Sequence, residues 1–265
     1  MPRRRLDAEL VRRGLARSRD QAAELVAAGR VEVRGNPATK VAALVDPADA
    51  VRVRDGGDPY ASRGGHKLAG ALAAFPGLRV DGRRCLDAGA STGGFTDVLL
   101  RNGAASVVAV DVGYGQLAWS LRTDPRVTVL DRTNVRELTP EAIGGPVALT
   151  VADLSFISLR LVLPALVSCT EPGGDLVPMV KPQFEVGRDR IERGVVRDPG
   201  LRTEAVLAVA RTAEDLGWGV AGVVASPLPG PSGNVEFFLW LRRDAAPVDE
   251  EAVGAVVRTA AGAQA

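Results

Sequence analysis

The chain has 265 residues, 46% of them apolar, and a formal net charge of +1, which indicates one large globular domain or a large and a small one. Residues 1–54 hold 12 Lys/Arg against 7 Asp/Glu, whereas the rest of the chain holds 21 against 25. A basic module of this kind is typical of proteins that bind a polyanion. No apolar signal-peptide segment opens the sequence, and the longest apolar stretch, residues 148–167, contains an Asp, an Arg and a Pro. We therefore expect a cytoplasmic protein without a membrane span.

The cysteine and histidine content limits the kinds of site that the chain can form. Cys85 and Cys169 lie in separate apolar runs without metal-ligand spacing, so we expect inert core thiols. His66 is the only histidine, which argues against a His-based catalytic triad and against a His-rich metal site. We therefore expect no bound metal.

The basic first 54 residues begin with two predicted helices. Asp7 is placed to cap a first short helix that ends at Gly14. Ser18 and Gln21 form a capping box for a second helix, which ends at Gly29. The spacing of apolar residues turns one face of each helix toward a small core.

Short strands follow these helices. Residues 31–33 alternate as a strand, residues 34–37 read as a turn, and residues 51–54 read as another strand. This segment resembles the S-four-type RNA-binding domain, named for a small-subunit ribosomal protein. The resemblance is carried by Arg5-Leu6-Asp7, Gly14 to Arg19, Ala22 and Gly29 to Val33.

The resemblance implies that basic side chains of this unit bind RNA. Phosphate contacts of this type supply affinity but little sequence information. A solvated charged face without a partner is the alternative. The residues that we expect to contact RNA here are Arg3, Arg4, Arg5, Arg17, Arg19, Arg30 and Lys40.

A Gly/Asp-rich stretch, residues 55–59, marks the end of the basic unit. We place an interdomain linker at residues 55–62, a second domain at residues 63–245 and a C-terminal helix or tail at residues 246–265. An Ala/Leu-rich helix is predicted at residues 68–75, with Arg63 and Lys67 just before it.

The second domain is organised around a glycine-rich turn. Residues 84–88 predict a buried strand, small residues follow at 89–94, and an amphipathic helix starts at Phe95. The next strand, residues 106–110, ends at Asp111, and a carboxylate there can accept both hydroxyls of a ribose. Small residues let a ligand approach the backbone, and the helix start offers free N–H donors.

The spacing of this turn favours one class of nucleotide. In Gly89-x-Ser91-x-x-Gly94 a serine stands where a dinucleotide site has its second glycine, and no Lys-Ser/Thr follows as in a phosphate-binding P-loop. A ligand with a ribose but no phosphates fits, and S-adenosylmethionine (SAM) is such a ligand. The alternative is a turn that needs glycine for packing alone.

The remaining elements alternate between strands and helices. We predict a helix at residues 114–121 and strands at residues 127–130, 147–152 and 176–180; these are followed by a helix at 201–216 and strands at 218–225 and 235–241. Such alternation indicates an α/β domain whose mostly parallel sheet is covered on both faces, with ligands beyond the carboxyl ends of the strands. Asp131 and Asn134, after one strand, are placed to meet an adenine edge. The predicted cofactor-binding residues are Asp87, Gly89, Ala90, Ser91, Thr92, Gly93, Gly94, Asp111, Asp131 and Asn134.

Two lysines and two carboxylates from distant segments suit the deprotonation of an alcohol. They are Lys67, Asp153, Lys181 and Glu236. An ordinary lysine, with a pKa of about 10.4, is protonated at neutral pH, but a neighbouring cation and partial desolvation lower the pKa of a lysine. Unrelated surface ion pairs are the alternative.

Several motifs of the second domain resemble those of the TlyA family, which consists of bacterial ribosomal-RNA cytidine 2′-O-methyltransferases also labelled hemolysins. These motifs lie at residues 62–68, 87–97, 111–117, 153–159, 180–185 and 230–237. The resemblance implies a Rossmann-like class I methyltransferase fold, a seven-stranded mostly parallel sheet whose last strand, residues 235–241, is antiparallel. It implies SAM as cofactor and a catalytic tetrad at Lys67, Asp153, Lys181 and Glu236.

The resemblance also bears on substrate and partners. The complete basic N-terminus is similar to that of family members that methylate both small- and large-subunit rRNA. Separately, some relatives carry a Trp where this chain has Tyr60. We expect a monomer that acts on ribosomal RNA or ribosomal subunits. Lys181 is the best candidate for the base because it ends a strand. Phe156 and Tyr114 are candidates to stack on a flipped nucleotide or to guard the pocket, with packing aromatics as the alternative, and Arg63 and Arg136 are expected to contact RNA.

Three other functions stay open at this point. A base N-methyltransferase commonly has an acid, two prolines and an aromatic residue after the fourth strand, and residues 153–156 have the acid and the aromatic but neither proline. A pore-forming hemolysin would need a membrane-inserting amphipathic stretch, which the sequence does not show. A non-catalytic RNA-binding module would bind RNA without methyl transfer.

Overall fold

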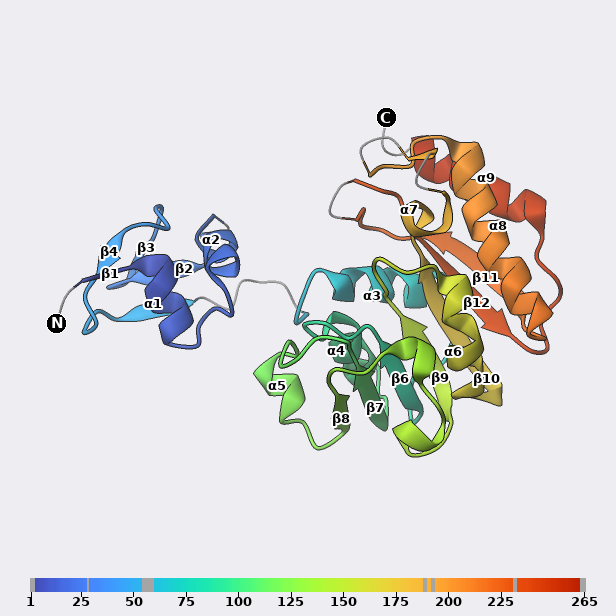
Figure 1. Ribbon diagram of the computed structural model, residues 1–265, viewed down its shortest axis with the longest axis horizontal. Coiled ribbons are helices and arrows are strands. Elements are labelled where there is room, and N and C mark those ends of the chain that lie inside the picture. Colours follow the sequence, from blue (N-terminus) through green and yellow to red (C-terminus); the bar gives the residue numbers. More distant parts are fainter. Residues whose placement is uncertain are drawn as a thin grey trace. The chain divides into compact units, whose positions relative to one another are not determined.

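The structure is a computed structural model that describes residues 3–27, 29–53, 60–187, 190–191, 194–230 and 233–262. The chain divides into two compact units, residues 1–59 and 60–265, here called the N-terminal unit and the C-terminal unit (Figure 1). Residues 55–59 of the predicted linker lie outside the described residues, and Tyr60 to Ser62 belong to the C-terminal unit. No helix in the described ranges is long and apolar enough to cross a membrane.

The N-terminal unit packs two helices against short antiparallel strands. Its strands pair in the order β3-β2-β5, with a separate pair of β1 and β4. Leu6, Leu10, Ala22 and Val31 are fully buried in its core. The elements are β1 (Arg4–Arg5), α1 (Leu6–Arg12), α2 (Arg19–Ala27), β2 (Val31–Val33), β3 (Asn36–Pro37), β4 (Leu44–Val45) and β5 (Val51–Val53).

The prediction that Asp7 caps the first helix is wrong. Arg5 is the N-cap of α1, and it makes no side-chain capping bond. Strand β1 leads directly into α1, so the backbone N–H groups of Leu6 and Asp7 bind the carbonyls of Ala43 and Val41 instead. The backbone of a neighbouring segment therefore satisfies the first two N–H groups of the helix, and the carboxylate of Asp7 accepts from the N–H of Ala8 at 2.7 Å within the first turn.

The second capping prediction is confirmed in its forward half. The Oγ of Ser18 accepts a hydrogen bond from the backbone N–H of Gln21 at 3.1 Å. The Gln21 side chain reaches back to the N–H of Arg17, one residue before the N-cap. The predicted four-residue turn at 34–37 is tighter than expected, because only Arg34 and Gly35 separate β2 from β3 and both have positive φ, as a two-residue hairpin turn requires.

The C-terminal unit is built on a seven-stranded sheet in the order β11-β12-β10-β9-β6-β7-β8. The five strands from β10 to β8 are parallel, and β12 is antiparallel to both of its neighbours, as predicted for the last strand. The strands are β6 (Arg84–Ala88), β7 (Ser106–Val110), β8 (Val127–Leu130), β9 (Val147–Ala152), β10 (Thr170–Val180), β11 (Gly219–Ala225) and β12 (Phe237–Arg242).

Helices cover both faces of this sheet (Figure 1). Successive strand residues point to opposite faces, so Leu86 joins one apolar cluster while Cys85 joins the other. Helices α3 and α4 pack in the Cys85 cluster, and α6, α8 and α9 pack in the Leu86 cluster. The helices are α3 (Gly64–Ala74), α4 (Gly94–Arg101), α5 (Trp119–Arg122), α6 (Leu163–Ser168), α7 (Pro182–Glu185), α8 (Pro199–Asp215) and α9 (Glu250–Gly262), with short 3₁₀ turns η1 (Val135–Glu137), η2 (Glu141–Ile143) and η3 (Leu159–Leu161).

Four predicted strands, at 84–88, 106–110, 127–130 and 147–152, are confirmed to the residue. The predicted core thiols are also confirmed, since Cys85 and Cys169 are free and buried, and burial raises the pKa of Cys85 to about 12. Strand β10 starts at Thr170, earlier than expected, and its pairing with β9 is irregular before Asp175.

Two helix predictions are corrected by the structure. The predicted helix at 114–121 is reduced to Trp119–Arg122, because the N–H groups of Gly113 and Gly115 are held by the carboxylates of Asp111 and Asp131. The helix expected from residue 68 starts at Gly64. Lys67 therefore lies in the first turn of α3 and not at a junction before the helix.

Candidate active site

The carboxyl ends of adjacent parallel strands bring the predicted site residues to one edge of the sheet. Strand β6 leads into the glycine-rich turn, β7 into Asp111, β9 into Asp153 and β10 into Lys181. Gly89 has φ +88, and a Cβ at this position would clash with the backbone carbonyl of Asp153. Glycine is therefore required where the turn passes the end of β9.

Asp111 links the end of β7 to the glycine-rich turn. Its Oδ2 accepts a hydrogen bond from the N–H of Ser91 at 2.8 Å, and its Oδ1 accepts one from the N–H of Gly113 at 2.7 Å. These bonds fix the carboxylate, yet each of its oxygens can accept a second hydrogen bond. The arrangement suits the two hydroxyls of a ribose.

A pocket opens beside the turn. Five predicted cofactor-binding residues line it, namely Gly89, Ala90, Ser91, Thr92 and Gly94. Lys67 and Asp153 also line it, whereas Asp87, Gly93, Asp111, Asp131 and Asn134 are outside its lining, as are Lys181 and Glu236. The sequence analysis gave no cofactor role to the remaining lining residues, Ser62, Arg63, Gly64, Phe95 and Pro229.

The four residues of the predicted tetrad form two ion pairs. The Nζ of Lys67 lies 2.5 Å from Oε2 of Glu236, and the Nζ of Lys181 lies 2.7 Å from Oδ1 of Asp153. Lys181 also donates to the Oγ of Ser155 at 2.8 Å. Ser155 is a contact that the sequence analysis missed, although it lies within the motif at 153–159.

Asp87 is a buried carboxyl that stands behind the turn at the end of β6. Its Oδ2 accepts a hydrogen bond from Oγ1 of Thr96 at 2.6 Å, while its Oδ1 has no hydrogen-bond partner among the described residues. Burial, together with the nearby carboxylates of Asp153 and Asp111, raises the pKa of Asp87 to about 7, against the opposing effect of Thr96. A positively charged group placed near this carboxyl would stabilise its ionised form.

Asp131 and Asn134 lie after β8 and bind groups close to them in sequence. Asp131 accepts from the N–H of Gly115 at 3.2 Å and pairs with Arg122 at 3.0 Å. Asn134 accepts from the N–H of Arg136 at 3.1 Å, which caps η1. The structure keeps both residues at the same edge of the sheet, and their contact with an adenine stays a prediction.

Two aromatic side chains stand out from the site into solvent. Phe156 is 92% exposed, with φ +64, and its ring centroid lies 5.3 Å from that of Phe184. Tyr114 is 67% exposed, and the guanidinium of Arg132 lies 4.3 Å from its ring centroid. This exposure differs from that of core aromatics such as Phe237, which is fully buried.

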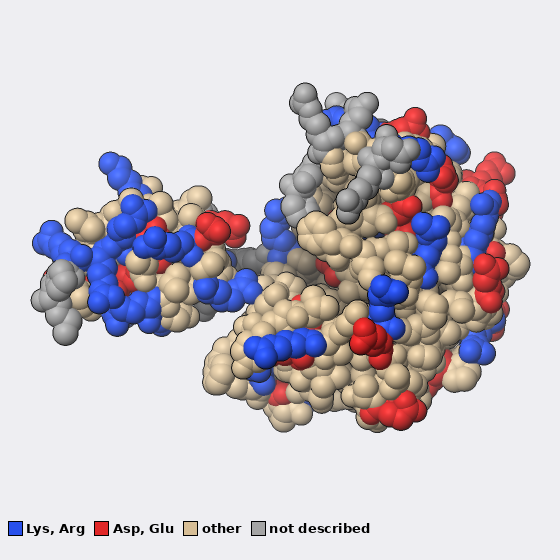
Figure 2. All heavy atoms as spheres, viewed as in Figure 1, with Lys and Arg blue, Asp and Glu red and all other residues tan. Residues whose placement is uncertain are grey.

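Basic side chains spread over the N-terminal unit, as the face seen in Figure 2 shows. Arg5 pairs with Asp7 at 2.9 Å, and Arg30 is half-buried. In the C-terminal unit, Arg63 and Arg136 are exposed. The other predicted RNA contacts of the N-terminal unit are all exposed and comprise Arg3, Arg4, Arg17, Arg19 and Lys40.

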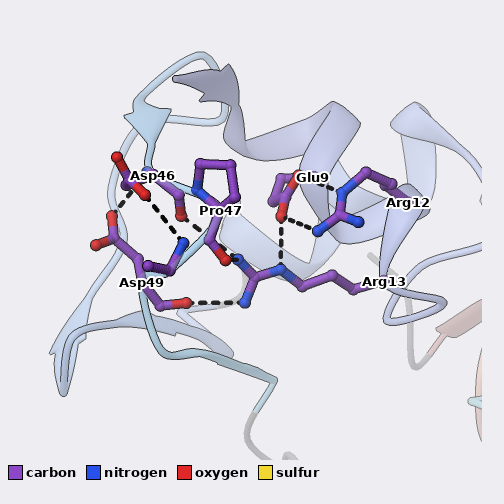
Figure 3. Close-up of polar contacts among 7 residues, drawn as sticks. Glu9, Arg12, Arg13, Asp46, Pro47 and Asp49 are labelled. Carbon is purple, nitrogen blue, oxygen red and sulfur yellow. Dashed lines mark hydrogen bonds and ion pairs between the residues drawn. The ribbon is translucent and has the colours of Figure 1, made fainter. Parts of the chain in front are cut away.

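Two further arginines of this unit are committed to internal contacts (Figure 3). Glu9, whose side chain is inaccessible to solvent, pairs with Arg12 at 2.6 Å and with Arg13 at 2.7 Å. Arg13 also donates to the carbonyls of Asp49 and Pro47. These arginines hold the pKa of Glu9 at about 2, so the cluster ties α1 to the loop after β4 as a permanent ionic clamp.

Comparison with known families defines the class of protein. Residues 60–243 match the model described as FtsJ-like methyltransferase, and residues 4–51 match the S4 domain. The fold and the site thus define a methyltransferase domain preceded by an S4 domain. This confirms the predicted fold class and the prediction of an enzyme.

The relatives narrow this class. A Mycobacterium tuberculosis protein named 16S/23S rRNA (cytidine-2'-O)-methyltransferase TlyA is 67% identical over 91% of this chain and 90% of its own length. Hemolysin A of Brachyspira hyodysenteriae is 35% identical over 88% of this chain and 97% of its own. A solved structure described as "Putative hemolysin from Streptococcus thermophilus" is 40% identical, covers 98% of this chain and 96% of its own, and has a TM-score of 0.77. The chain belongs to the TlyA family of FtsJ-like methyltransferases.

Proposed function

We propose that this methyltransferase uses SAM to methylate the ribose 2′-hydroxyl of cytidine in ribosomal RNA, in both the small and the large subunit. The observation that supports the proposal is a pair of ion pairs, Lys67 with Glu236 and Lys181 with Asp153, each of which contributes one residue to the lining of the pocket at the glycine-rich turn. The name of the 67% identical relative supports the substrate and the reaction. Its printed name includes both 16S and 23S rRNA, which supports modification of both subunits.

The residues at the turn fit SAM as cofactor. Gly89 to Thr92 and Gly94 provide a lining without bulky side chains, and Asp111 keeps acceptor capacity for the ribose hydroxyls. The carboxyl of Asp87, buried behind the turn, would favour a cationic ligand through its charge. Asp131 and Asn134 would face the adenine. When bound, SAM supplies an electrophilic methyl group.

The residues of this chain would hold and move the proton of the target hydroxyl. Lys181 is the proposed proton acceptor, because its place at the end of β10 fixes its backbone. The Nζ of a lysine has three hydrogen-bonding positions. In Lys181, Asp153 and Ser155 fill two of them. The third position of Nζ can therefore face the 2′-hydroxyl while Asp153 orients the side chain. Lys67, held by Glu236, would orient the hydroxyl.

A cytidine inside a helix is hard to present with its 2′-hydroxyl in line, so we propose that it flips out. Phe156 is the proposed stacking partner, with Tyr114 beside the pocket and Arg63 and Arg136 on the adjoining phosphates. Phe156→Ala should lower the rate of methyl transfer more than it lowers subunit binding. A folded variant with an unchanged rate would remove Phe156 from this role.

We propose that seven cations of the N-terminal unit, all exposed except the half-buried Arg30, bind rRNA phosphates. These are Arg3, Arg4, Arg5, Arg17, Arg19, Arg30 and Lys40. Arg4→Ala combined with Arg19→Ala should weaken subunit binding and flatten its salt dependence, whereas Arg211→Ala, in an exposed pair with Glu250, serves as the control. Equal salt slopes in all three proteins would contradict this electrostatic role.

The proposed function is tested by methyl transfer from labelled SAM to each purified ribosomal subunit, with the product located by ribose-specific mapping. We expect a 2′-O-methylcytidine in each subunit. Label on a base would favour an N-methyltransferase, and binding without label would favour a non-catalytic module. Asp111→Ala provides a second check, since calorimetry should show weaker SAM binding if this carboxylate holds the ribose.

A further inference from the structure

One loop of the site is held at both ends by a single short segment. The loop runs from Asp153, at the end of β9, to Leu159, where η3 begins. At its start, Lys181 binds Asp153 and Ser155. At its end, Oε2 of Glu185 accepts from the Oγ of Ser158 at 2.5 Å, and Oε1 accepts from the N–H of Leu159 at 2.7 Å. Lys181 is the N-cap of α7 and Glu185 is its last residue, so this one short helix braces both ends of the loop.

The middle of this braced loop carries the exposed Phe156. Its positive φ of 64° is a left-handed conformation, which costs a non-glycine residue free energy. Because the ring is 92% exposed, burial of the ring does not repay this cost. The conformation therefore depends on how the two ends of the loop are held.

The carboxylate of Glu185 serves this loop although it belongs to α7. Its side chain is inaccessible to solvent, and its two oxygens bind partners 26 and 27 residues earlier in the chain. Arg160 lies 3.4 Å from Oε2 and balances the buried charge. The mechanism proposed above does not use Glu185, and the sequence analysis gave it no role.

We infer that Glu185 is a positioning residue that holds Phe156 in its exposed conformation. This inference rests on the proposed function only for the role of Phe156, which is to stack on the target base. Loss of the carboxylate leaves the buried N–H of Leu159 without its acceptor and releases one end of the loop. The Lys181 end stays bound. The ring of Phe156 then samples other orientations, while the cofactor pocket, which shares only Asp153 with this loop, keeps its lining.

The position of Phe156 can be measured without any substrate. The chain has six phenylalanines, so ¹⁹F NMR of protein labelled with 4-fluorophenylalanine gives a small set of signals, and Phe156→Leu assigns the relevant one. In Glu185→Ala, we expect the signals of Phe156 and its neighbour Phe184 to shift or broaden while the others stay in place. Unchanged signals of Phe156 and Phe184 would overturn the inference.

A matched control separates this effect from general loss of stability. Asp175, within β10, is also a buried carboxylate. It accepts hydrogen bonds from Trp240 at 2.6 Å and from Arg83 at 2.5 Å. Asp175→Ala should leave the Phe156 signal unchanged; a shift equal to that in Glu185→Ala would contradict specific positioning. If Glu185→Ala does not fold, Ser158→Ala removes one of the two bonds and should move the same signals by less.

The kinetic arm is a double-mutant cycle under single-turnover conditions on saturating ribosomal subunits. Glu185→Ala should lower the rate by about 10- to 100-fold with unchanged SAM affinity, since misplaced groups cost rates of this size. Combined with Phe156→Ala, it should add less than twofold to the loss from Phe156→Ala alone, because both changes remove one function. Additive losses would overturn the inference. If the wild-type protein transfers no methyl group, the proposed function fails, while the NMR comparison still decides on Glu185.

Discussion

The two lysine–carboxylate pairs of the site differ in how they meet solvent. In the first pair, the side chains of Lys67 and Glu236 are 11% and 1% exposed. In the second, Lys181 is 9% exposed but Asp153 is 24% exposed, and Ser155 adds a third partner. The first pair is closed around its carboxylate, whereas the second is open on its carboxylate side.

This difference suggests separate tasks for the two pairs. A buried ion pair is costly to break, because the partner left behind is an uncompensated charge in a medium of low dielectric. A pair with an open carboxylate can exchange partners with an incoming ligand at lower cost, since water replaces the lost contact. We therefore expect the closed pair to support the shape of the site and the open pair to carry the proton transfer.

The largest expected effect is on activity and concerns Lys181. Lys181→Ala should lower single-turnover methyl transfer by about 10²- to 10⁴-fold, the usual loss when a general base is removed, while the fold and SAM affinity are kept. Lys181→Arg should be nearly as inactive, because arginine cannot give up a proton at accessible pH. Rates measured across pH provide the check.

The matched variant for this test is Lys67→Arg, which keeps a cation beside Glu236. We expect it to retain more activity than Lys181→Arg. A near-normal rate and pH profile in Lys181→Arg, with loss in Lys67→Arg, would reverse the tasks assigned to the two pairs.

The next effect is on stability and should fall on the closed pair. Lys67→Ala should lower the free energy of unfolding by about 3–5 kcal/mol, because it leaves Glu236 buried without its cation. Lys181→Ala should cost less, since Asp153 can be hydrated. All three tryptophans, at positions 119, 218 and 240, belong to the C-terminal unit, so fluorescence-detected urea unfolding follows that unit. Adding Glu236→Gln to Lys67→Ala should recover part of the loss; equal losses in the two single variants would remove the distinction.

Asp87, unlike Glu236 and Asp153, is a buried carboxyl without a lysine partner among the described contacts. Its pKa of about 7 in the folded protein lies above the ordinary 3.8, so the folded state binds the proton more tightly than the unfolded state. Stability should therefore fall as pH rises from about 4 to about 7, by an amount on the order of a few kcal/mol. In Asp87→Asn this decline should disappear. The measurement is the urea midpoint at both ends of that pH range without cofactor, and an unchanged slope in the variant would show that other groups cause it.

The smallest effect is expected at Ser155, the partner that only the open pair has. Ser155→Ala removes one hydrogen bond to Lys181 and keeps the ion pair with Asp153. The cost of about 0.5–1.5 kcal/mol corresponds to a rate loss of roughly two- to tenfold. Single-turnover rates are again the measurement, with Ser168→Ala, on a surface helix end, as the control. A loss as large as that of Lys181→Ala would make the hydroxyl a direct participant.

Sequence patterns predicted most of the sheet because each strand is a local apolar run bounded by small or polar residues. The same patterns placed Asp111, Asp153 and Lys181 at strand ends, which a parallel sheet brings to one edge. They failed at residues 114–121, where an apparent helix yields to backbone bonds with Asp111 and Asp131. Local periodicity contains no information about such contacts across the sheet edge.

The candidate site was predictable in its residue types and less so in its connections. The resemblance to the TlyA family pointed to the four charged residues, but which lysine pairs with which carboxylate depends on side-chain placement in three dimensions. The bond between Glu185 and Ser158 joins residues 27 apart, and neither residue type at its position signals the other. Lys67 was placed outside its helix because Gly64 and Gly65 are poor helix formers, yet both lie in its first turn.

The clamp around Glu9 should limit how strongly salt weakens RNA binding by the N-terminal unit. Arg12 and Arg13 count toward the positive charge of the unit, yet the buried carboxylate of Glu9 pairs with both of them, and backbone carbonyls also bind Arg13. Exposed cations such as Arg4 and Lys40 should displace the counterions condensed on the RNA phosphates, each adding about 0.7–0.9 to the slope of log affinity against log salt. The measured slope should therefore fall short of the number of arginines in the sequence, and substituting Arg13 should unfold the unit before it changes that slope.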